Sequence, residues 1–185
     1  MNIRQHVIIT TITMLFGISV LKTNSVGQAN DQPDIKLQPS TGTFAVYGDI
    51  RFTDASHCLM SSAYARKALI ERIANLSEKP DFVALTGDIV YRGDDSKDWS
   101  VFDDETKPFR DQSLQLFAVL GNHDLRGATG QSNFVEHFEE LKKHSELKTR
   151  AWYSLEYGNN THFILLDSQS SYAGGSPQGQ WLTNS

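Results

Sequence analysis

Three short apolar runs, each followed by a glycine and an oxygen-bearing residue, most constrain what this 185-residue chain can fold into. They occupy residues 44–47, 82–86 and 116–120, and none alternates polar with apolar side chains. Continuous apolar runs of this length are typical of strands that are buried on both faces of a parallel sheet. We therefore predict three strands of an α/β sheet.

A helix is predicted between the first two runs, over residues 61–76. Leu69, Ile73 and Leu76 recur there at helical spacing, and Pro80 ends the pattern. A strand, a helix and a strand within this length form a βαβ unit, so the first two strands should be parallel.

The rest of the chain predicts a smaller set of elements. Residues 94–104 are acidic and should be irregular, with Trp99 and Phe102 anchored in the core. The other expected elements are a helix over 133–143, a hairpin of strands 152–157 and 162–166, and a helix over 178–182.

Composition excludes some classes of function. The formal net charge is −5, and no nucleic-acid-binding signature is expected because such proteins normally carry a basic face. Hydrophobic residues make up 39% of the chain, which is enough for a packed core. Cys58 is the single cysteine, so no internal disulfide can form.

The amino terminus has the pattern of an export signal. Arg4 precedes an apolar stretch over residues 7–21, which is shorter than the roughly 20 residues of a membrane span. We expect a signal peptide over 1–29, a linker over 30–42 and one domain over 43–185. The chain should then be exported to the periplasm or the extracellular space, with no stable membrane span after signal removal. An uncleaved membrane anchor is the alternative.

The residues after the three runs have the chemistry of a metal site. Ligands of open α/β sheets bind beyond the carboxyl ends of the strands, where the chain places Asp49, Asp88 and Asn122. Their carboxylate and amide oxygens suit Mn, Mg, Fe and, with a histidine, Zn. Asp88, on the middle tip, could bridge two metals. His123 could protonate a leaving group, and Asp124 could orient its imidazole.

These motifs resemble those of the calcineurin-like metallophosphoesterases. Gly-Asp at 48–49 and 87–88 and Gly-Asn-His-Asp at 121–124 match that family in order, and the similarity extends over about residues 43–182. Gly-Asp-x-x-Tyr, ending at Tyr91, resembles the purple acid phosphatases, in which the tyrosinate binds a metal. The resemblance implies a sandwich-like α+β fold and a hydrolase of phosphoester substrates.

The resemblance also implies a cofactor and a set of site residues. The cofactor would be two divalent or mixed-valence ions, of Mn, Fe or Zn, whose bound hydroxide attacks phosphorus. The implied metal ligands are Asp49, Asp88, Asn122 and Tyr91. The implied catalytic residues are His123, Asp124 and Arg51.

Two departures from the family pattern affect this site. Arg51 stands where many members have a metal-binding histidine, and an arginine has no acceptor with which to ligate. Its planar fork could bind a substrate phosphate instead, or it could form a salt bridge; His57 is a loose substitute ligand. The later histidine motifs of the family are missing. We therefore expect an amino-terminal portion of a longer enzyme, with an incomplete fold.

Other functions are left open. The chain could be a catalytically inactive truncated fragment, or a non-enzymatic member of the same fold that binds phosphate or a partner. A haloacid-dehalogenase-type phosphatase would share Asp49 and Thr53, but Arg51 replaces its second aspartate. A dinucleotide-binding domain would need Gly-x-Gly-x-x-Gly after the first strand, and that motif is not there.

Overall fold

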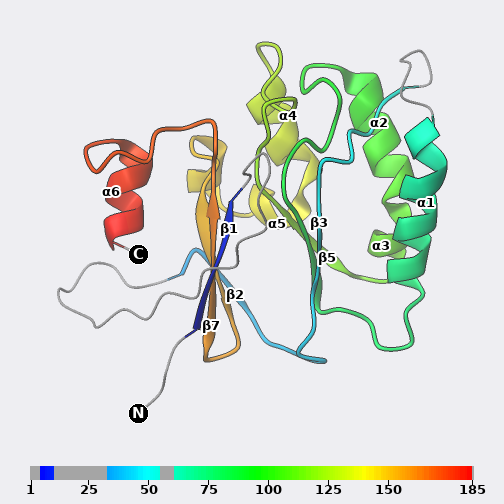
Figure 1. The fold of residues 1–185 in the computed structure, drawn as a ribbon, viewed down its shortest axis with the longest axis horizontal. Coiled ribbons are helices and arrows are strands. Elements are labelled where there is room, and N and C mark those ends of the chain that lie inside the picture. Colours follow the sequence, from blue (N-terminus) through cyan, green and yellow to red (C-terminus); the bar gives the residue numbers. More distant parts are fainter. Residues whose placement is uncertain (1–4, 11–32, 55–60, 185) are drawn as a thin grey trace.

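The computed structural model describes residues 5–10, 33–54 and 61–184 (Figure 1). Within these ranges the strands are β1 (Gln5–Thr10), β2 (Ile35–Leu37), β3 (Ala45–Tyr47), β4 (Phe82–Leu85), β5 (Gln115–Ala118), β6 (Tyr153–Tyr157) and β7 (Thr161–Leu166). The helices are α1 (Ser61–Ala74), α2 (Ser96–Glu105), α3 (Lys107–Asp111), α4 (Gly130–His137), α5 (Glu139–Lys142), the 3-10 helix η1 (Ser145–Lys148) and α6 (Pro177–Asn184).

The strands form two sheets. One has the order β3-β4-β5 and is entirely parallel. The other has the order β1-β7-β6-β2, with β6 and β7 antiparallel. The predicted βαβ unit is confirmed as β3-α1-β4, and the predicted hairpin is confirmed as β6-β7. The turn of that hairpin contains Gly158 at a φ of 61°.

The two sheets pack face to face through aromatic side chains. Phe163 of β7 makes edge-to-face contacts with Phe82 of β4 at 5.3 Å and with Phe44 at 4.9 Å between ring centroids. Helices α1, α2 and α3 cover the outer face of the β3-β4-β5 sheet, and α6 lies beyond the other sheet (Figure 1). The layers are therefore helix, sheet, sheet and helix, which confirms the sandwich-like α/β fold.

One buried phenol joins the second sheet to the edge of the first. Tyr153 donates its hydroxyl hydrogen to the carbonyl of Ala118 at 2.7 Å and accepts the Ala118 N–H at 2.9 Å. Burial raises the pKa of Tyr153, so the hydroxyl keeps its proton. Both backbone groups of an edge residue are thereby satisfied inside the core.

Two sequence-based expectations about helices were wrong. Residues 94–104 are not irregular, because most of them form α2, whose first turn is capped by the Asp95 side chain accepting the Lys97 N–H. Trp99 and Phe102 are fully buried, as expected. The helix expected over 133–143 is two helices, because Phe138 has an extended backbone with φ −115° and ψ 100°. Phe138 instead turns into the core, where it packs on Phe134 at 5.0 Å between ring centroids.

The structure also revises the beginning of the domain. The first strand is not buried on both faces, since β3 is an edge strand and Val46 is 46% exposed. Part of the expected linker over 30–42 forms β2, which pairs with β6 and buries Ile35. Within the expected signal peptide, β1 pairs with β7; the rest of that segment lies outside the described residues, as does His57.

None of the helices in the described part of the chain is both long enough and apolar enough to cross a membrane.

Candidate functional site

Strands β3, β4 and β5 are parallel, so their carboxyl ends meet at one edge of the sheet. The pairing continues into the loops beyond these ends. The N–H of Asp49 donates to Gly87 O at 2.9 Å, and the N–H of Arg51 donates to Asp88 O at 2.9 Å. The first two tips are therefore held against each other by their main chains before any side chain takes part.

Left-handed backbone conformations concentrate at these two tips. Asp49, Arg51 and Asp88 have φ values of 58°, 48° and 49°, and they are three of the four non-glycine residues with positive φ among those described. Such a conformation costs a non-glycine residue roughly 1–2 kcal/mol. Strain of this kind persists where the surrounding structure enforces it, and it clusters at functional sites.

Gly121 allows the third tip to approach the second closely. A Cβ atom at this position would lie 2.2 Å from both the backbone nitrogen and the Oδ1 of Asp88. Real Cβ atoms do not approach other atoms so closely, so only glycine fits without moving Asp88. The Gly-Asn-His-Asp segment is therefore brought directly onto the Asp88 carboxylate.

Arg51 links the two aspartates. Its Nη2 lies 2.9 Å from Asp49 Oδ1 and 3.1 Å from Asp88 Oδ2. Asp49 is largely exposed, Arg51 is 38% exposed and Asp88 is almost buried, so the pair of contacts opens toward solvent. The salt-bridging alternative for Arg51 is thus observed, and the guanidinium stands at the centre of the site.

His123 is the buried neighbour of Asp88. Its backbone N–H donates to Asp88 Oδ1 at 3.0 Å, and its ring Nε2 lies 4.0 Å from Asp88 Oδ2. The ring contacts the Tyr91 carbonyl oxygen through Nδ1 at 2.8 Å and Nη2 of Arg126 through Nε2 at 2.9 Å. The sequence predicts that Asp124 orients this imidazole, but the ring is held by Tyr91 and Arg126 instead.

Asp124 supports the loops of the site. Its carboxylate is fully buried and accepts the backbone N–H groups of Ile89 at 2.8 Å, Val90 at 3.0 Å and Gly121 at 2.8 Å. Burial raises the pKa of Asp124 to about 7, against the lowering effect of these hydrogen bonds. The side chain therefore joins the loop after β4 to the loop after β5.

Asn122 and Tyr91 complete the set of predicted ligands. Asn122 follows Gly121 on the third tip and is exposed. The Tyr91 ring lies 5.3 Å from the His123 ring, between centroids. The structure thus brings Asp49, Arg51 and Asp88 into one connected group with His123, while Asp124 lies beneath it.

Comparison with known proteins gives the family of this chain. The sequence model of the calcineurin-like phosphoesterases matches residues 42–180. The chain belongs to the calcineurin-like phosphoesterase family. A search of the curated proteins found no match.

One solved structure has a similar fold. The chain is similar to a purple acid phosphatase isolated from yellow lupin (Lupinus luteus) seeds, with a TM-score of 0.52 and 17% sequence identity. The similarity covers 82% of this chain and 28% of the phosphatase chain. This likeness concerns the fold of the shared part.

Calcineurin-like phosphoesterases generally bind divalent metal ions. Among the residues that the structure describes, no three His, Cys, Asp or Glu side chains gather closely enough to hold one. Asp49 and Asp88 nevertheless direct one oxygen each at a common point, which Nη2 of Arg51 takes. Carboxylate oxygens around one positive centre are the donors of a hard divalent ion. These two aspartates therefore fit such an ion in place of the guanidinium.

Sequence reasoning missed Arg126. This residue lies on the exposed loop after β5, and its guanidinium stacks over the Tyr91 ring at 5.3 Å from the centroid. The available signal was its position three residues after His123, on a loop already expected to form the site.

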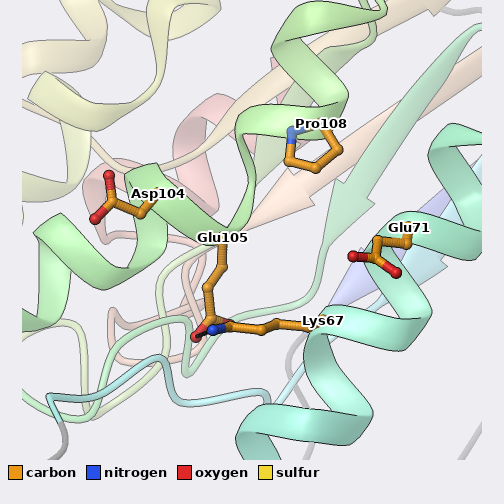
Figure 2. Close-up of a pocket in the computed structure, with 5 residues that line it drawn as sticks. All are labelled: Lys67, Glu71, Asp104, Glu105 and Pro108. Carbon is orange, nitrogen blue, oxygen red and sulfur yellow. Dashed lines mark ion pairs between the residues drawn. The ribbon is translucent and has the colours of Figure 1, made fainter.

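A hollow elsewhere on the molecule is a feature of helix packing. It has a volume of about 180 Å³ and is lined by Lys67, Glu71, Asp104, Glu105 and Pro108, between α1 and the α2-α3 segment (Figure 2). Glu105 forms a bidentate pair with buried Arg66, at 2.6 and 2.8 Å. The Glu105 carboxylate is therefore held by the packing of the helices, and Lys67 Nζ of α1 also lies 4.0 Å from its Oε1.

Proposed function

We propose that this chain carries the site of a metal-dependent phosphoester hydrolase, centred on Asp88. One observation carries the proposal: three strand tips deliver Asp49, Asp88 and His123 to one connected group. Membership in the calcineurin-like phosphoesterase family supports the same reaction class. The substrate would be a phosphoester.

The proposed cofactor is a dinuclear centre. Two divalent or mixed-valence ions, of Mn, Fe or Zn, would be held by Asp49, Asp88, Asn122 and Tyr91 and would supply the hydroxide nucleophile and neutralise phosphoryl charge. The convergence of the Asp49 and Asp88 oxygens supports this assignment. For such an ion to enter between them, the Arg51 guanidinium must turn away.

The chain's own side chains would bind and orient the phosphoryl group. Arg51, once released from the aspartates, can donate two parallel hydrogen bonds to phosphoryl oxygens through its planar fork. His123 lies beside Asp88 and would protonate the leaving oxygen or stabilise charge in the transition state. Asp124 would act indirectly, through the two loops that it joins.

A metal-dependent assay tests this function. The purified chain is treated with chelator, reloaded separately with Mn, Fe or Zn, and assayed on p-nitrophenyl phosphate and a p-nitrophenyl phosphodiester. We expect turnover that chelator abolishes and that at least one metal restores. Turnover that is insensitive to chelator, or no turnover with any metal, would contradict the proposal.

A non-enzymatic phosphate-binding function is the second candidate. The observation that favours it is the Arg51 guanidinium at the strand tips, a cation that could bind phosphate without a metal once released from the two carboxylates. Calorimetric titration with inorganic phosphate in the presence of chelator separates the two functions. Phosphate binding without metal, together with no turnover, would support this second function.

We also propose export of the chain to the periplasm or the extracellular space. The proposal rests on the signal-like pattern of residues 1–29. Mass spectrometry of the mature protein tests it, because cleavage near residue 29 is expected. A mature protein that retains the first residues would favour the anchored alternative.

A further inference from the structure

Arg126 is in direct contact with the imidazole of His123. Its Nη2 lies 2.9 Å from His123 Nε2, and its Nη1 lies 3.4 Å from the Tyr91 carbonyl oxygen. The guanidinium also stacks over the Tyr91 ring. Three contacts thus fix the position of a side chain that lies on an exposed loop.

The partners of the imidazole determine where its proton lies. A guanidinium has only donors, so His123 Nε2 must accept the hydrogen bond from Arg126. The Tyr91 carbonyl only accepts, so His123 Nδ1 must donate to it. Both contacts are satisfied together by one form of the ring, the neutral imidazole that carries its hydrogen on Nδ1.

The main chain of His123 is fixed independently of the ring. Its N–H donates to Asp88 Oδ1 at 3.0 Å. Its carbonyl oxygen accepts the N–H groups of Gly93 and Arg126, both at 3.1 Å. Since the backbone is held in this way, the freedom left to His123 is the rotation and tautomer of its ring, which the side chain of Arg126 contacts directly.

We propose that Arg126 is a positioning residue for His123, holding its imidazole in the Nδ1–H tautomer with Nε2 beside Asp88. In this state Nε2 is a hydrogen-bond acceptor 4.0 Å from Asp88 Oδ2. The kinetic part of the inference rests on the proposed hydrolase function, whereas the tautomer does not.

Nitrogen-15 NMR of histidine-labelled protein tests the tautomer directly. His123→Gln assigns the signal by its disappearance. We expect the wild type to show the Nδ1–H form, Arg126→Ala to shift toward the Nε2–H form or a mixture, and Arg126→Lys to restore part of the wild-type signal. An Nε2–H wild type, or an unchanged spectrum in Arg126→Ala, would overturn the inference.

Arg92→Ala is the matched control for this experiment. Arg92 is an exposed arginine of the neighbouring loop whose guanidinium pairs with Asp94 at 3.2 Å. Its removal alters net charge as Arg126→Ala does, so a general electrostatic effect would move the His123 signal in both variants. We expect the signal to move in Arg126→Ala alone; equal shifts in both variants would overturn the inference.

Kinetics separate positioning from simple substrate binding. Loss of a hydrogen-bonding partner that orients a functional histidine typically lowers activity by about 10-fold to 100-fold. We expect kcat to fall by that factor in Arg126→Ala with a smaller change in KM, and Arg126→Lys to recover part of it. A change confined to KM would overturn positioning. If the wild type shows no turnover, the hydrolase proposal fails, and the NMR measurement still decides the tautomer.

Discussion

The two ends of β4 each carry an aspartate, and their surroundings differ in kind. Asp81, before the strand, accepts the N–H groups of Ser40, Thr41 and Gly42 at 2.9–3.0 Å, and it also accepts the hydroxyl of Tyr157. Asp88, after the strand, shares its oxygens between a backbone N–H and the guanidinium of Arg51. The first end is held by neutral donors, and the second holds a cation.

This difference indicates that Asp81 stabilises the fold, whereas Asp88 forms part of the site. Neutral amides around Asp81 fix the chain that leads into β3, on unstrained backbone. At Asp88 the backbone is left-handed and the cation is shared with a second carboxylate. At Asp88, another cation could replace the Arg51 guanidinium that the two carboxylates share. At Asp81, the carboxylate is bound by backbone N–H groups, which no ligand can replace without unfolding the local chain.

The sharpest test of this comparison is a matched pair of substitutions. Asp88→Asn removes a negative charge from the centre of the site, and we expect turnover to fall about 100-fold or more. Asp81→Asn, at the other end of the strand, should leave turnover per folded molecule unchanged. Steady-state assays with circular dichroism of both variants provide the measurement. Full activity in Asp88→Asn would break the comparison.

Gly121→Ala tests the close approach at the Asp88 end. The added Cβ would overlap the backbone nitrogen of Asp88, and overpacking of this kind costs about 1–3 kcal/mol in the free energy of unfolding. Gly174→Ala is the control, because a Cβ there meets nothing within 4 Å; it should change stability by about 0.5 kcal/mol at most. Urea denaturation measures both. Equal stabilities would show that the third tip is not constrained by Asp88.

Asp81→Ala tests the other end, where only stability should respond. The three lost backbone hydrogen bonds are exposed, so water replaces much of their contribution, whereas the bond from the Tyr157 hydroxyl is partly buried. We expect the free energy of unfolding to fall by about 1 kcal/mol. Asp111→Ala, which removes an exposed partner of Lys107, should cost about 0.5 kcal/mol or less. A loss of activity per folded molecule in Asp81→Ala would contradict the assignment of Asp81 to stability alone.

The smallest expected effect is a pH dependence at Asp81. Burial alone would raise the pKa of Asp81, but the hydrogen bonds from Tyr157 and from Thr41, Ser40 and Gly42 outweigh it and lower the pKa. The resulting stability is fully present above the unfolded-state pKa of about 3.9 and is lost as the pH falls through the lower folded-state value.

Tyr157→Phe should therefore lose part of this contribution. We expect the gap in unfolding free energy between wild type and Tyr157→Phe to shrink as the pH falls from about 6 to about 2. Urea titrations across that range give the measurement. Tyr64→Phe, on a highly exposed tyrosine, should show a gap without pH dependence. A constant gap for Tyr157→Phe would contradict the assigned role of its hydroxyl.

The sequence predicted the sheet better than its surroundings. Apolar runs located β4 and β5 because burial on both faces leaves a continuous pattern. The same reasoning failed for Val46, since position at the edge of a sheet is set by distant strands. Helix α2 was not predicted from the acidic segment that ends at Asp104. Trp99 and Phe102 form only a short apolar stripe, and most of the helix faces water, so the helical pattern in the sequence is weak.

The site was predictable where its residues stand in motifs, and less so where they act through contacts. Asp49, Asp88 and His123 were expected together from the ends of parallel strands. The placement of the Arg51 guanidinium between two carboxylates depends on left-handed φ values that no sequence pattern showed. The contact of Arg126 with the imidazole depends on the course of an irregular loop, whose shape is set by tertiary packing.

The position of Arg51 has a thermodynamic consequence for any free cation. The Arg51 guanidinium already neutralises the two aspartates, so a dissolved cation must displace it in order to bind. The apparent affinity for that cation therefore equals its intrinsic affinity multiplied by the fraction of molecules in which Arg51 has turned away from the aspartates. An incoming oxyanion shifts the same equilibrium in favour of the cation, because it gives the displaced guanidinium a new partner. Anion and cation would then bind this site cooperatively, each lowering the concentration at which the other binds.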